Sequence, residues 1–435
     1  MRILVISADF PPTQSGEASH AYFTALHLAR LGHDVHVLTS RVASSLPEAP
    51  FTTHAVMPAW NWRSLPRFRH AVRQCRPDAV ILIFLGLMYH HHPMITFAPS
   101  IVHRMLPRAR FVTQFENLGS YTWTMPPGTR LIRKLVARWL SPKELDYEYG
   151  SLLRDSDALV FLSQSQLAHL DGRHPHTRQK GHLIPPPPNV LVCPKSAQLR
   201  SETRSELGIG DDEFTLLYFG YIYPGKGIEL ILKAMAELLR EGRRLRFLVI
   251  GGPLQRQRRS PESDASREYF AAMRALTSEL NLHNQVHWLG PLPCTNDELS
   301  RYMFAADACV LPFQGGVRLN NSSFAACAVH GLPVITTRTD HTEPDFRDHE
   351  NVLLCPPQSS TALKAAISKL MHEAATRSRL SAGVTALSKK WYSWDHAIEH
   401  VSTLLWQEKQ CSCSLKNMSG ASSLMTPEMR SGASD

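Results

Sequence analysis

The sequence predicts an α/β protein of two similar domains that face each other across a central cleft. Short apolar runs alternate with longer helical patterns, which is typical of parallel sheets covered by helices. The alternation stops at the four prolines of residues 185–188 and restarts near residue 214. At 435 residues the chain also exceeds the usual size of one hydrophobic core. Ligands of open α/β sheets bind beyond the carboxyl ends of the strands, so the cleft is the expected site.

Apolar runs and helical periodicity locate the elements in order along the chain. In the first half, strands are expected at residues 3–7, 34–40, 79–85, 110–115, 158–163 and 182–185. In the second half they are expected at residues 214–220, 245–252, 286–290, 308–313 and 332–337. The segment at 20–32 has apolar residues three and four apart and a closing glycine, which predicts an amphipathic helix. Further helices are expected at 227–242, 296–307, 359–374 and 395–408.

These elements define the expected domains. We predict an N-terminal domain over residues 1–190 and a C-terminal domain over 191–394. A helix over 395–410 is expected to pack back on the N-terminal domain. The tail over 411–435 is rich in Ser, Gly and Met and lacks periodicity, which indicates disorder.

Composition narrows the class of protein. The longest apolar run, residues 79–89, is too short for a membrane span and is better interpreted as a buried strand. The N-terminus does not resemble a signal peptide, which favours a cytoplasmic location. A formal net charge of +9 favours anionic partners, but no motif that reads nucleic acid accompanies the charge.

No metal site is expected. The eight cysteines are scattered and are interpreted mostly as core thiols, and Cys411 and Cys413 lack a second pair at zinc-site spacing. The triplet His90 to His92 has no partner cluster, so a metal is not expected there. At a strand end that faces the cleft, one of these residues could instead contact an acceptor.

Three glycine-containing loops follow predicted strands. The first, residues 10–20, places Gly16 and Glu17 at the start of a helix, where backbone N–H groups can bind an anion; a plain strand-to-helix turn is the alternative. The second, residues 218–234, contains Gly220, Gly225 and Lys226. A lysine at a helix start opposes the helix dipole unless a polyanion lies between, although a solvated surface lysine is the alternative. The spacing is not that of a Walker loop.

The third loop, within residues 311–337, joins a strand to a helix of small residues. Its glycines, amides and hydroxyls suit a phosphorylated ligand. Ser322 or Ser323 is expected to cap the helix, and the Arg318 guanidinium is expected to contact a diphosphate. Two such loops in one domain favour a phosphate-binding function.

Taken in order, these motifs resemble those of the nucleotide-sugar glycosyltransferases of family 4, which have the GT-B fold. The resemblance spans residues 1–408 and rests on FPPTQSGEASHAYFTALHLARLGHDVHVLT, FGYIYPGKG, FLVIGG, VHWLGPLPCTNDELSRYMFAADACVLPF, HGLPVITT and WYSWDHAIEH. It implies two Rossmann-like domains, with a nucleoside diphosphate sugar as co-substrate bound mainly by the C-terminal domain. It also implies transfer with retention of configuration, without a cofactor or a required metal.

The resemblance assigns roles to particular residues. Lys226 becomes a ligand of the diphosphate, Gly16 lies near the donor phosphates, the amides from Gly316 to Asn320 face the phosphates and sugar, and the segment 288–292 lies near the base. The candidate substrate-binding residues are Gly16, Glu17, Gly220, Tyr221, Gly225, Leu289, Gly316, Val317, Asn320, Asn321 and Ser322. The candidate catalytic residues are Lys226, Arg318 and Glu116.

The chain also departs from the family pattern. Arg318 and Ala326 occupy the places of the usual pair of glutamates, and Tyr221 occupies the place of a common arginine. Phe115 takes the place of an expected histidine, with Glu116 beside it. Because a retaining transfer needs no protein nucleophile, positioning and electrostatics can suffice without the carboxylates.

Two further features concern the acceptor. Glu116 directly follows a strand and is a candidate general base, with hydrogen bonding within its loop as the alternative, whereas His20 is assigned to helix packing. The segment 128–144 alternates basic residues with Leu and Trp. This pattern fits a helix on an anionic membrane surface and a lipid-linked acceptor, or equally a helix that covers the core. A second basic run, residues 254–267, is expected to be a solvated loop.

We therefore expect a cytoplasmic glycosyltransferase that moves a sugar to a hydroxyl of a glycan or lipid-linked acceptor, in polysaccharide or glycoconjugate biosynthesis, with peripheral contact to a membrane as an option. A catalytically silent nucleotide-sugar-binding or scaffold protein is the alternative from a different class. A sugar-nucleotide epimerase on the same plan is less favoured, because acid and base groups near the sugar are scarce.

Overall fold

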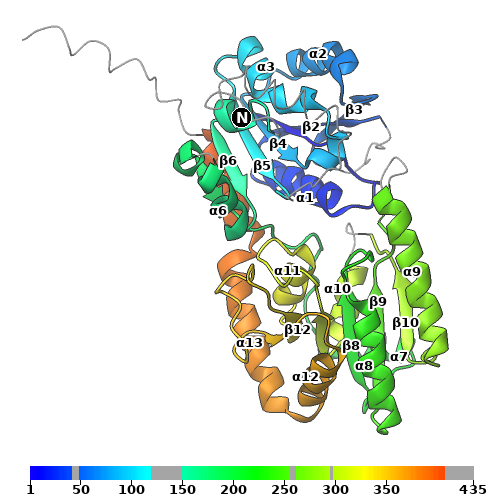
Figure 1. The fold of residues 1–435 in the computed structure, drawn as a ribbon. Coiled ribbons are helices and arrows are strands. Elements are labelled where there is room, and N and C mark those ends of the chain that lie inside the picture. Colours follow the sequence, from blue (N-terminus) through cyan, green and yellow to red (C-terminus); the bar gives the residue numbers. More distant parts are fainter. Residues whose placement is uncertain (42–48, 119–148, 174, 255–260, 294–296, 407–435) are drawn as a thin grey trace, which may run out of the picture.

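The computed structural model describes residues 1–41, 49–118, 149–173, 175–254, 261–293 and 297–406. Two α/β domains lie one above the other in Figure 1, each a parallel sheet with helices on its faces. This architecture confirms the predicted fold class. No described helix combines the length and hydropathy needed to cross a membrane.

The N-terminal domain contains a seven-stranded parallel sheet in the order β3-β2-β1-β4-β5-β6-β7. Its strands are β1 (Arg2–Ile6), β2 (Asp34–Ser40), β3 (Thr52–Met57), β4 (Ala79–Phe84), β5 (Arg110–Phe115), β6 (Ala158–Phe161) and β7 (Gly181–Leu183). Its helices include α1 (Gly16–Arg30), α2 (Leu65–Cys75), α3 (Ala98–Met105), α5 (Leu152–Asp155) and α6 (Gln164–Arg173). Every residue of β4 is buried, so the first part of the longest apolar run is an internal strand, whereas its end, Gly86–Tyr89, forms a 3-10 helix. The edge strand β3 was not predicted, because it is mostly half-buried and has no apolar run.

The C-terminal domain contains a six-stranded parallel sheet in the order β10-β9-β8-β11-β12-β13. Its strands are β8 (Phe214–Phe219), β9 (Leu245–Ile250), β10 (Val286–Gly290), β11 (Ala308–Leu311), β12 (Val334–Thr337) and β13 (Leu353–Cys355). Its helices are α7 (Ala197–Glu206), α8 (Ile228–Arg240), α9 (Pro261–Glu279), α10 (Glu298–Ala305), α11 (Ser322–Val329), α12 (Ser360–His372) and α13 (Ala374–Trp391). The prediction of a loop up to residue 267 is wrong from Pro261 onward. Pro261 and the acidic residues that follow it begin α9, and both features favour a helix N-terminus.

Each sheet reverses its strand order at one point. In the N-terminal sheet β1 lies between β2 and β4, and in the C-terminal sheet β8 lies between β9 and β11. The loops that leave β1 and β8 therefore diverge from those that leave β4 and β11, which opens a crevice at the carboxyl end of each sheet. Both crevices contribute to the space between the domains.

The last described helix, α14 (Trp394–Trp406), leaves the C-terminal domain and packs on the N-terminal one. Its apolar face joins the N-terminal core through Ile398, Val401, Leu404 and Leu405. The Trp394 indole stacks on the His27 ring of α1, with 4.7 Å between ring centroids, and its Nε1 donates a hydrogen bond to the carbonyl of Pro188 at 2.9 Å. The chain thus crosses between the domains twice. Trp394 in the second crossing is hydrogen-bonded to Pro188 in the first.

Candidate functional site

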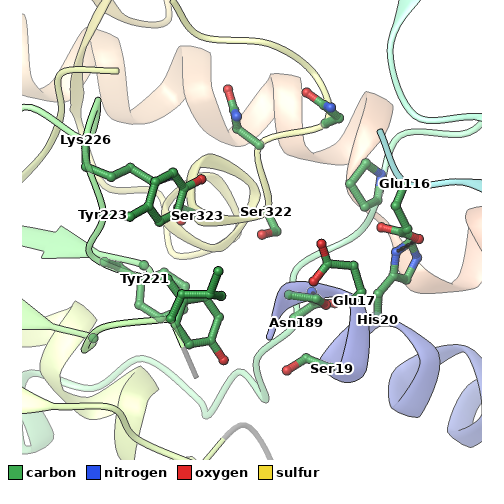
Figure 2. Close-up of a pocket in the computed structure, with 18 of the residues that line it drawn as sticks. Glu17, Ser19, His20, Glu116, Asn189, Tyr221, Tyr223, Lys226, Ser322 and Ser323 are labelled. Carbon is green, nitrogen blue, oxygen red and sulfur yellow. Dashed lines mark hydrogen bonds and ion pairs between the residues drawn. The ribbon is translucent and has the colours of Figure 1, made fainter. Parts of the chain in front are cut away.

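A cavity of about 640 Å³ lies between the two domains. Its walls come from the loops after β1, β4 and β5 on one side and from those after β8 and β11 on the other. Figure 2 shows side chains from α1 and from the loop after β5 facing those of the C-terminal loops across this space. The volume is in the range of small-molecule sites.

Close backbone packing shapes the C-terminal wall. Gly220, directly after β8, has a φ of +137°, and a Cβ added there would lie 2.5 Å from the Ser323 Oγ. Gly227 has a φ of +73°, and its Cβ would lie 2.5 Å from the carbonyl oxygen of Pro312. Only glycine adopts these conformations without strain and also leaves room for the neighbouring loop. The two glycine loops of this domain are therefore packed against each other at the cavity.

Lys226 is the cation of the C-terminal wall. Its Nζ lies 4.6 Å from the ring centroids of both Tyr223 and Phe313, so two aromatic faces hold the ammonium. Lys226 and both aromatic residues line the cavity, as does Tyr221 (Figure 2). An ammonium in this position can bind the negative charge of a ligand.

The start of α11 contributes amides and hydroxyls. Asn320, Asn321, Ser322 and Ser323 all line the cavity. The prediction that Ser322 or Ser323 caps α11 is wrong: Asn321 is the capping residue, and its side chain makes no capping bond to the helix. The Asn321 Oδ1 instead accepts a hydrogen bond from the backbone N–H of Arg318 at 2.7 Å, which fixes the loop that precedes the helix.

Most of the loop amides that were expected to face phosphates instead donate hydrogen bonds to other groups of the protein. The N–H of Gly316 donates to the carbonyl of Phe313, and that of Val317 donates to the carbonyl of Thr337 at 2.9 Å. The N–H of Leu319 donates to the Glu343 carboxylate at 3.2 Å. Together with the N–H of Arg318, these groups are not offered to a ligand in this structure.

Several other candidate residues lie outside the cavity lining. Val317 is fully buried in the C-terminal core, and Leu289 packs against the same core. Gly316 packs against the threonines of the loop after β12, where a Cβ would meet the Thr339 Oγ1 at 2.5 Å. The remaining two, Gly225 and Arg318, also fall outside the set of residues that line the cavity.

Glu343 is a buried carboxylate that sequence reasoning missed. It is 4 % exposed, and its Oε1 has no hydrogen-bond partner among the described residues. Burial raises the pKa of the Glu343 carboxyl, and the positive charge of Arg318 opposes this shift. The hydrogen bond that its carboxylate accepts from the Leu319 N–H stabilises the conformation of the loop before α11. The surrounding sequence, HTEPDF, contains no recognisable signal for this role.

A glutamate and a histidine form the centre of the N-terminal wall. The Glu116 Oε1 lies 2.9 Å from the His20 Nδ1, and the side chains are 10 % and 5 % exposed. The Gln114 Nε2 donates to the same carboxylate oxygen at 2.8 Å. The assignment of His20 to packing was incomplete: its ring does pack edge-on against Trp394, but it also lines the cavity beside Glu116. Figure 2 shows the imidazole and the carboxylate side by side.

The linker between the domains supplies one further polar group. The Asn189 Nδ2 donates to the carbonyl of Gly16 at 3.2 Å, which joins the linker to the start of α1. Asn189 lines the cavity together with Gly16 and Glu17. Its buried Oδ1 has no partner in the part of the chain that the structure describes. A lone asparagine after four prolines gave no sequence signal for this position.

The described residues contain no group of three or more His, Cys, Asp or Glu side chains that could hold a metal ion. Within the triplet His90 to His92, the His92 Nδ1 accepts a hydrogen bond from the N–H of Met94 at 3.1 Å, a local capping contact. The basic segment 128–144, the Cys411 and Cys413 pair and the tail 411–435 lie outside the described residues.

The arrangement suits transfer between two bound molecules. One wall carries an ammonium, hydroxyls and amides, and the facing wall carries a carboxylate hydrogen-bonded to an imidazole. A polyanionic leaving group fits the first wall, and a hydroxyl that must lose a proton fits the second.

Two family models match the chain, one for each domain. The model described as "Glycosyltransferase Family 4" matches residues 15–190, and the one described as "Glycosyl transferases group 1" matches residues 213–373. Together they cover the loops on both walls of the cavity.

Curated relatives carry the name D-inositol 3-phosphate glycosyltransferase. The relative from Nocardia farcinica is 24% identical over 93% of this chain and 90% of its own length, and that from Acidothermus cellulolyticus is 26% identical over 87% and 82%. A Nocardioides relative is 30% identical over 46% of this chain and 43% of its own length. With this relative and with one from Thermomonospora curvata, the chain matches only about half of the relative's length.

Solved structures share the fold. The Anabaena protein Alr3699/HepE in complex with UDP and glucose has a TM-score of 0.68 at 14% identity, over 93% of this chain and 99% of that chain. Sucrose-phosphate synthase from Thermosynechococcus elongatus has a TM-score of 0.63 at 19% identity, over 93% and 98%. At these identities the likeness concerns the fold.

Proposed function

Because the chain belongs to the family 4 glycosyltransferases of the GT-B fold, we propose that it transfers a sugar from a nucleoside diphosphate sugar to an acceptor hydroxyl. The observation that carries the proposal is the position of Lys226, an ammonium at the carboxyl end of β8, on the wall opposite a Glu–His pair. The relatives' names and the bound UDP of the Anabaena structure support the same reaction class.

In this proposal the diphosphate lies against Lys226 and the start of α11. As the bond between the sugar and the diphosphate breaks, negative charge grows on the departing phosphate oxygen. A fixed ammonium in a partly closed site stabilises that charge without reorganisation, which is a large term in such reactions. The hydroxyl of Ser322 and the side chain of Asn320, which line the cavity, hold the sugar or the phosphates in this proposal.

The acceptor lies against the N-terminal wall. Its oxygen forms the new bond to the sugar on the face that the diphosphate leaves, so configuration is retained and no protein nucleophile is required. The hydroxyl proton passes to the departing phosphate oxygen or to Glu116. The His20 imidazole, held by that carboxylate, orients the reacting groups. No resident cofactor takes part in this scheme, and metal independence is part of the proposal.

A glycan or a lipid-linked glycan is the proposed acceptor, in polysaccharide or glycoconjugate assembly. A cytoplasmic location with peripheral contact to an anionic membrane would suit such an acceptor. Both statements rest on the sequence pattern, and vesicle sedimentation of the full chain tests the membrane contact.

One observation favours a second function. Arg318 and Ala326 stand where the family has glutamates, and Ala326 is fully buried, which leaves its position without any polar group. A catalytically silent protein that binds a nucleotide sugar would tolerate this loss.

Thermal stabilisation of the full chain by a panel of nucleoside diphosphates and their sugars, followed by assay of nucleotide release, separates the two functions. UDP and UDP-glucose are the first probes. Stabilisation together with release in the presence of an acceptor supports the enzyme, whereas stabilisation without release supports the silent protein. Absence of stabilisation across the panel would contradict both.

A further inference from the structure

Two neighbouring helices of the N-terminal domain carry exposed charges of one sign. α2 and α3 pack against each other, and Figure 1 shows both at the end of this domain that lies away from the C-terminal one. The exposed arginines on or directly beside these helices, here called the arginine surface, are Arg63, Arg67, Arg69, Arg73, Arg76, Arg104 and Arg108.

No carboxylate of the same segments offsets this charge. The sequence contains no Asp or Glu between Glu48 and Asp78, and none from residue 79 to residue 115. Within the described part of the chain, the arginines of this surface form no ion pair. Their guanidinium groups are therefore available to an anion outside the protein.

An exposed indole lies where the two helices begin. Trp62 starts the 3-10 turn η1 (Trp62–Ser64) that precedes α2, and it is 47 % exposed. Its ring lies 5.9 Å from that of His92 and 6.0 Å from that of Phe97, measured between centroids. These two residues lie at the ends of η3 (Pro93–Phe97), the turn that precedes α3. The indole is thus held between the starts of both helices while about half of it faces solvent.

Apolar side chains next to the arginines favour one class of partner. Leu65 on α2 and Ile101 and Met105 on α3 are only partly buried. Arginines combined with an exposed Trp and partly covered apolar side chains are typical of contact with an anionic membrane. Single-stranded nucleic acid would instead require several exposed rings for stacking, and Phe68 of α2 is fully buried.

The arginine surface begins at the edge of the sheet that forms the cavity. β4 continues through Leu85 and Leu87, which line the cavity, to His92 and the start of α3. β3 and β4 belong to one parallel sheet, so the turns that follow them leave from the same edge. Trp62 therefore lies at the cavity edge of the domain, and α2 and α3 run away from it.

From these observations we propose that the arginine surface and Trp62 bind the face of an anionic lipid bilayer. The guanidinium groups contact lipid phosphates, and the indole lies at the level of the headgroups. The inference rests on the membrane contact of the proposed function and assigns it to a surface, but it does not require the transfer reaction. A bilayer bound there brings a lipid-linked acceptor to the edge of the cavity.

Sedimentation of the full chain with lipid vesicles tests the proposal. Vesicles of phosphatidylcholine alone are compared with vesicles of equal parts phosphatidylcholine and phosphatidylglycerol. We expect binding to the anionic vesicles that weakens as the salt concentration rises, because salt screens exposed charges. Equal binding to both kinds of vesicle, or binding to neither, would overturn the proposal.

Replacement of arginines by glutamine tests the surface itself. The first variant replaces Arg67, Arg69, Arg73 and Arg104. Its partition into anionic vesicles should fall at least about tenfold. The matched control removes the same charge from the C-terminal domain by replacing the exposed residues Lys233, Arg240, Arg243 and Lys389. An equal loss in the control would assign the effect to net charge and refute the assignment.

A third variant covers the other basic segment of this domain. It replaces Arg130, Arg133, Lys134 and Arg138. If only this variant loses vesicle binding, the contact lies outside α2 and α3 and the proposal is wrong. Displacement of the wild-type protein from anionic vesicles by an equal concentration of RNA phosphate would assign the arginine surface to nucleic acid, which also overturns it.

The indole is tested separately. Trp62→Ala should reduce the partition at least about threefold. Trp406→Ala is the matched control, since Trp406 is also exposed but lies at the end of α14. Equal effects of the two replacements would contradict the role of Trp62.

Titration with UDP separates this inference from the proposed function. The residues replaced on α2, on α3 and in the C-terminal control lie outside the cavity lining, so the affinity for UDP should stay unchanged. Loss of vesicle binding with intact UDP binding supports the proposal. A wild-type protein that binds anionic vesicles but no nucleoside diphosphate would contradict the proposed function and still support the lipid contact.

Discussion

Replacement of Lys226 by alanine removes the ammonium that we assign to the donor diphosphate. In the structure its Nζ lies 4.6 Å from two ring centroids, and it is held on the wall of the cavity. A hydrogen bond to a charged group contributes about 1.5 to 3 kcal/mol. Because about 1.4 kcal/mol corresponds to a factor of ten in affinity, UDP should bind roughly 10-fold to 150-fold more weakly.

Isothermal titration of UDP into the wild-type and variant proteins measures this change. Lys233→Ala is the matched control, because Lys233 is exposed on α8 and lies outside the cavity. Lys226→Arg keeps the charge and should recover part of the affinity. The stacking of the ammonium on two rings is also lost in Lys226→Ala, so a small decrease in Tm is expected and has to be measured separately.

A loss in UDP affinity of less than about twofold in a folded Lys226→Ala protein would refute the assignment. A similar loss in Lys233→Ala would show that the effect comes from the net charge of the domain. In either case the diphosphate would have to bind elsewhere on the C-terminal wall.

Three further changes test other parts of the structure. Glu116→Gln removes the carboxylate charge beside the buried His20 imidazole, so kcat should fall at least about tenfold while the affinity for UDP stays unchanged. Equal losses in kcat and in UDP affinity would mean that the donor site is disturbed. Gly220→Ala should lower the free energy of unfolding by about 1 to 3 kcal/mol. The control is Gly242→Ala, which should cost less because φ is also positive there but no atom lies within 4 Å of the added Cβ. Denaturant unfolding measures the free energy of unfolding of both variants. Burial lowers the pKa of His330 to about 4, below its value in the unfolded chain. Its contribution to stability is therefore complete above pH 6.5 and is lost as pH falls toward 4, on the order of 3 kcal/mol. The slope of stability against pH between these values should flatten in His330→Gln.

Local signals were sufficient for the fold and for part of the site. The runs at β4 and β8 are short, apolar and followed by turn residues, so strand, loop and helix could be read from neighbouring residues alone. The same reasoning located Lys226 and Gly220, because a glycine loop after a strand constrains its own backbone. Edge strand β3 was not predicted, because it is half-buried and lacks an apolar run.

Contacts between distant segments account for the rest. His20 and Glu116 lie almost 100 residues apart, so their pairing became visible only when α1 and β5 were placed together. The amide of Leu319 looked available from its loop sequence, yet it is bound by Glu343, which comes from the segment after β12. A periodicity argument cannot tell whether a loop amide faces a ligand or a buried side chain of the same protein.

The packing of α14 on the N-terminal domain affects how the chain folds while it is being synthesised. Four apolar side chains of this helix complete the N-terminal core, and burial of each contributes roughly 1.5 to 3 kcal/mol. These residues are translated after the whole C-terminal domain. On the ribosome, the first domain to emerge is therefore the last to complete its core, and a fragment that ends at the linker would leave uncovered the parts of β4, β5 and α1 that α14 contacts.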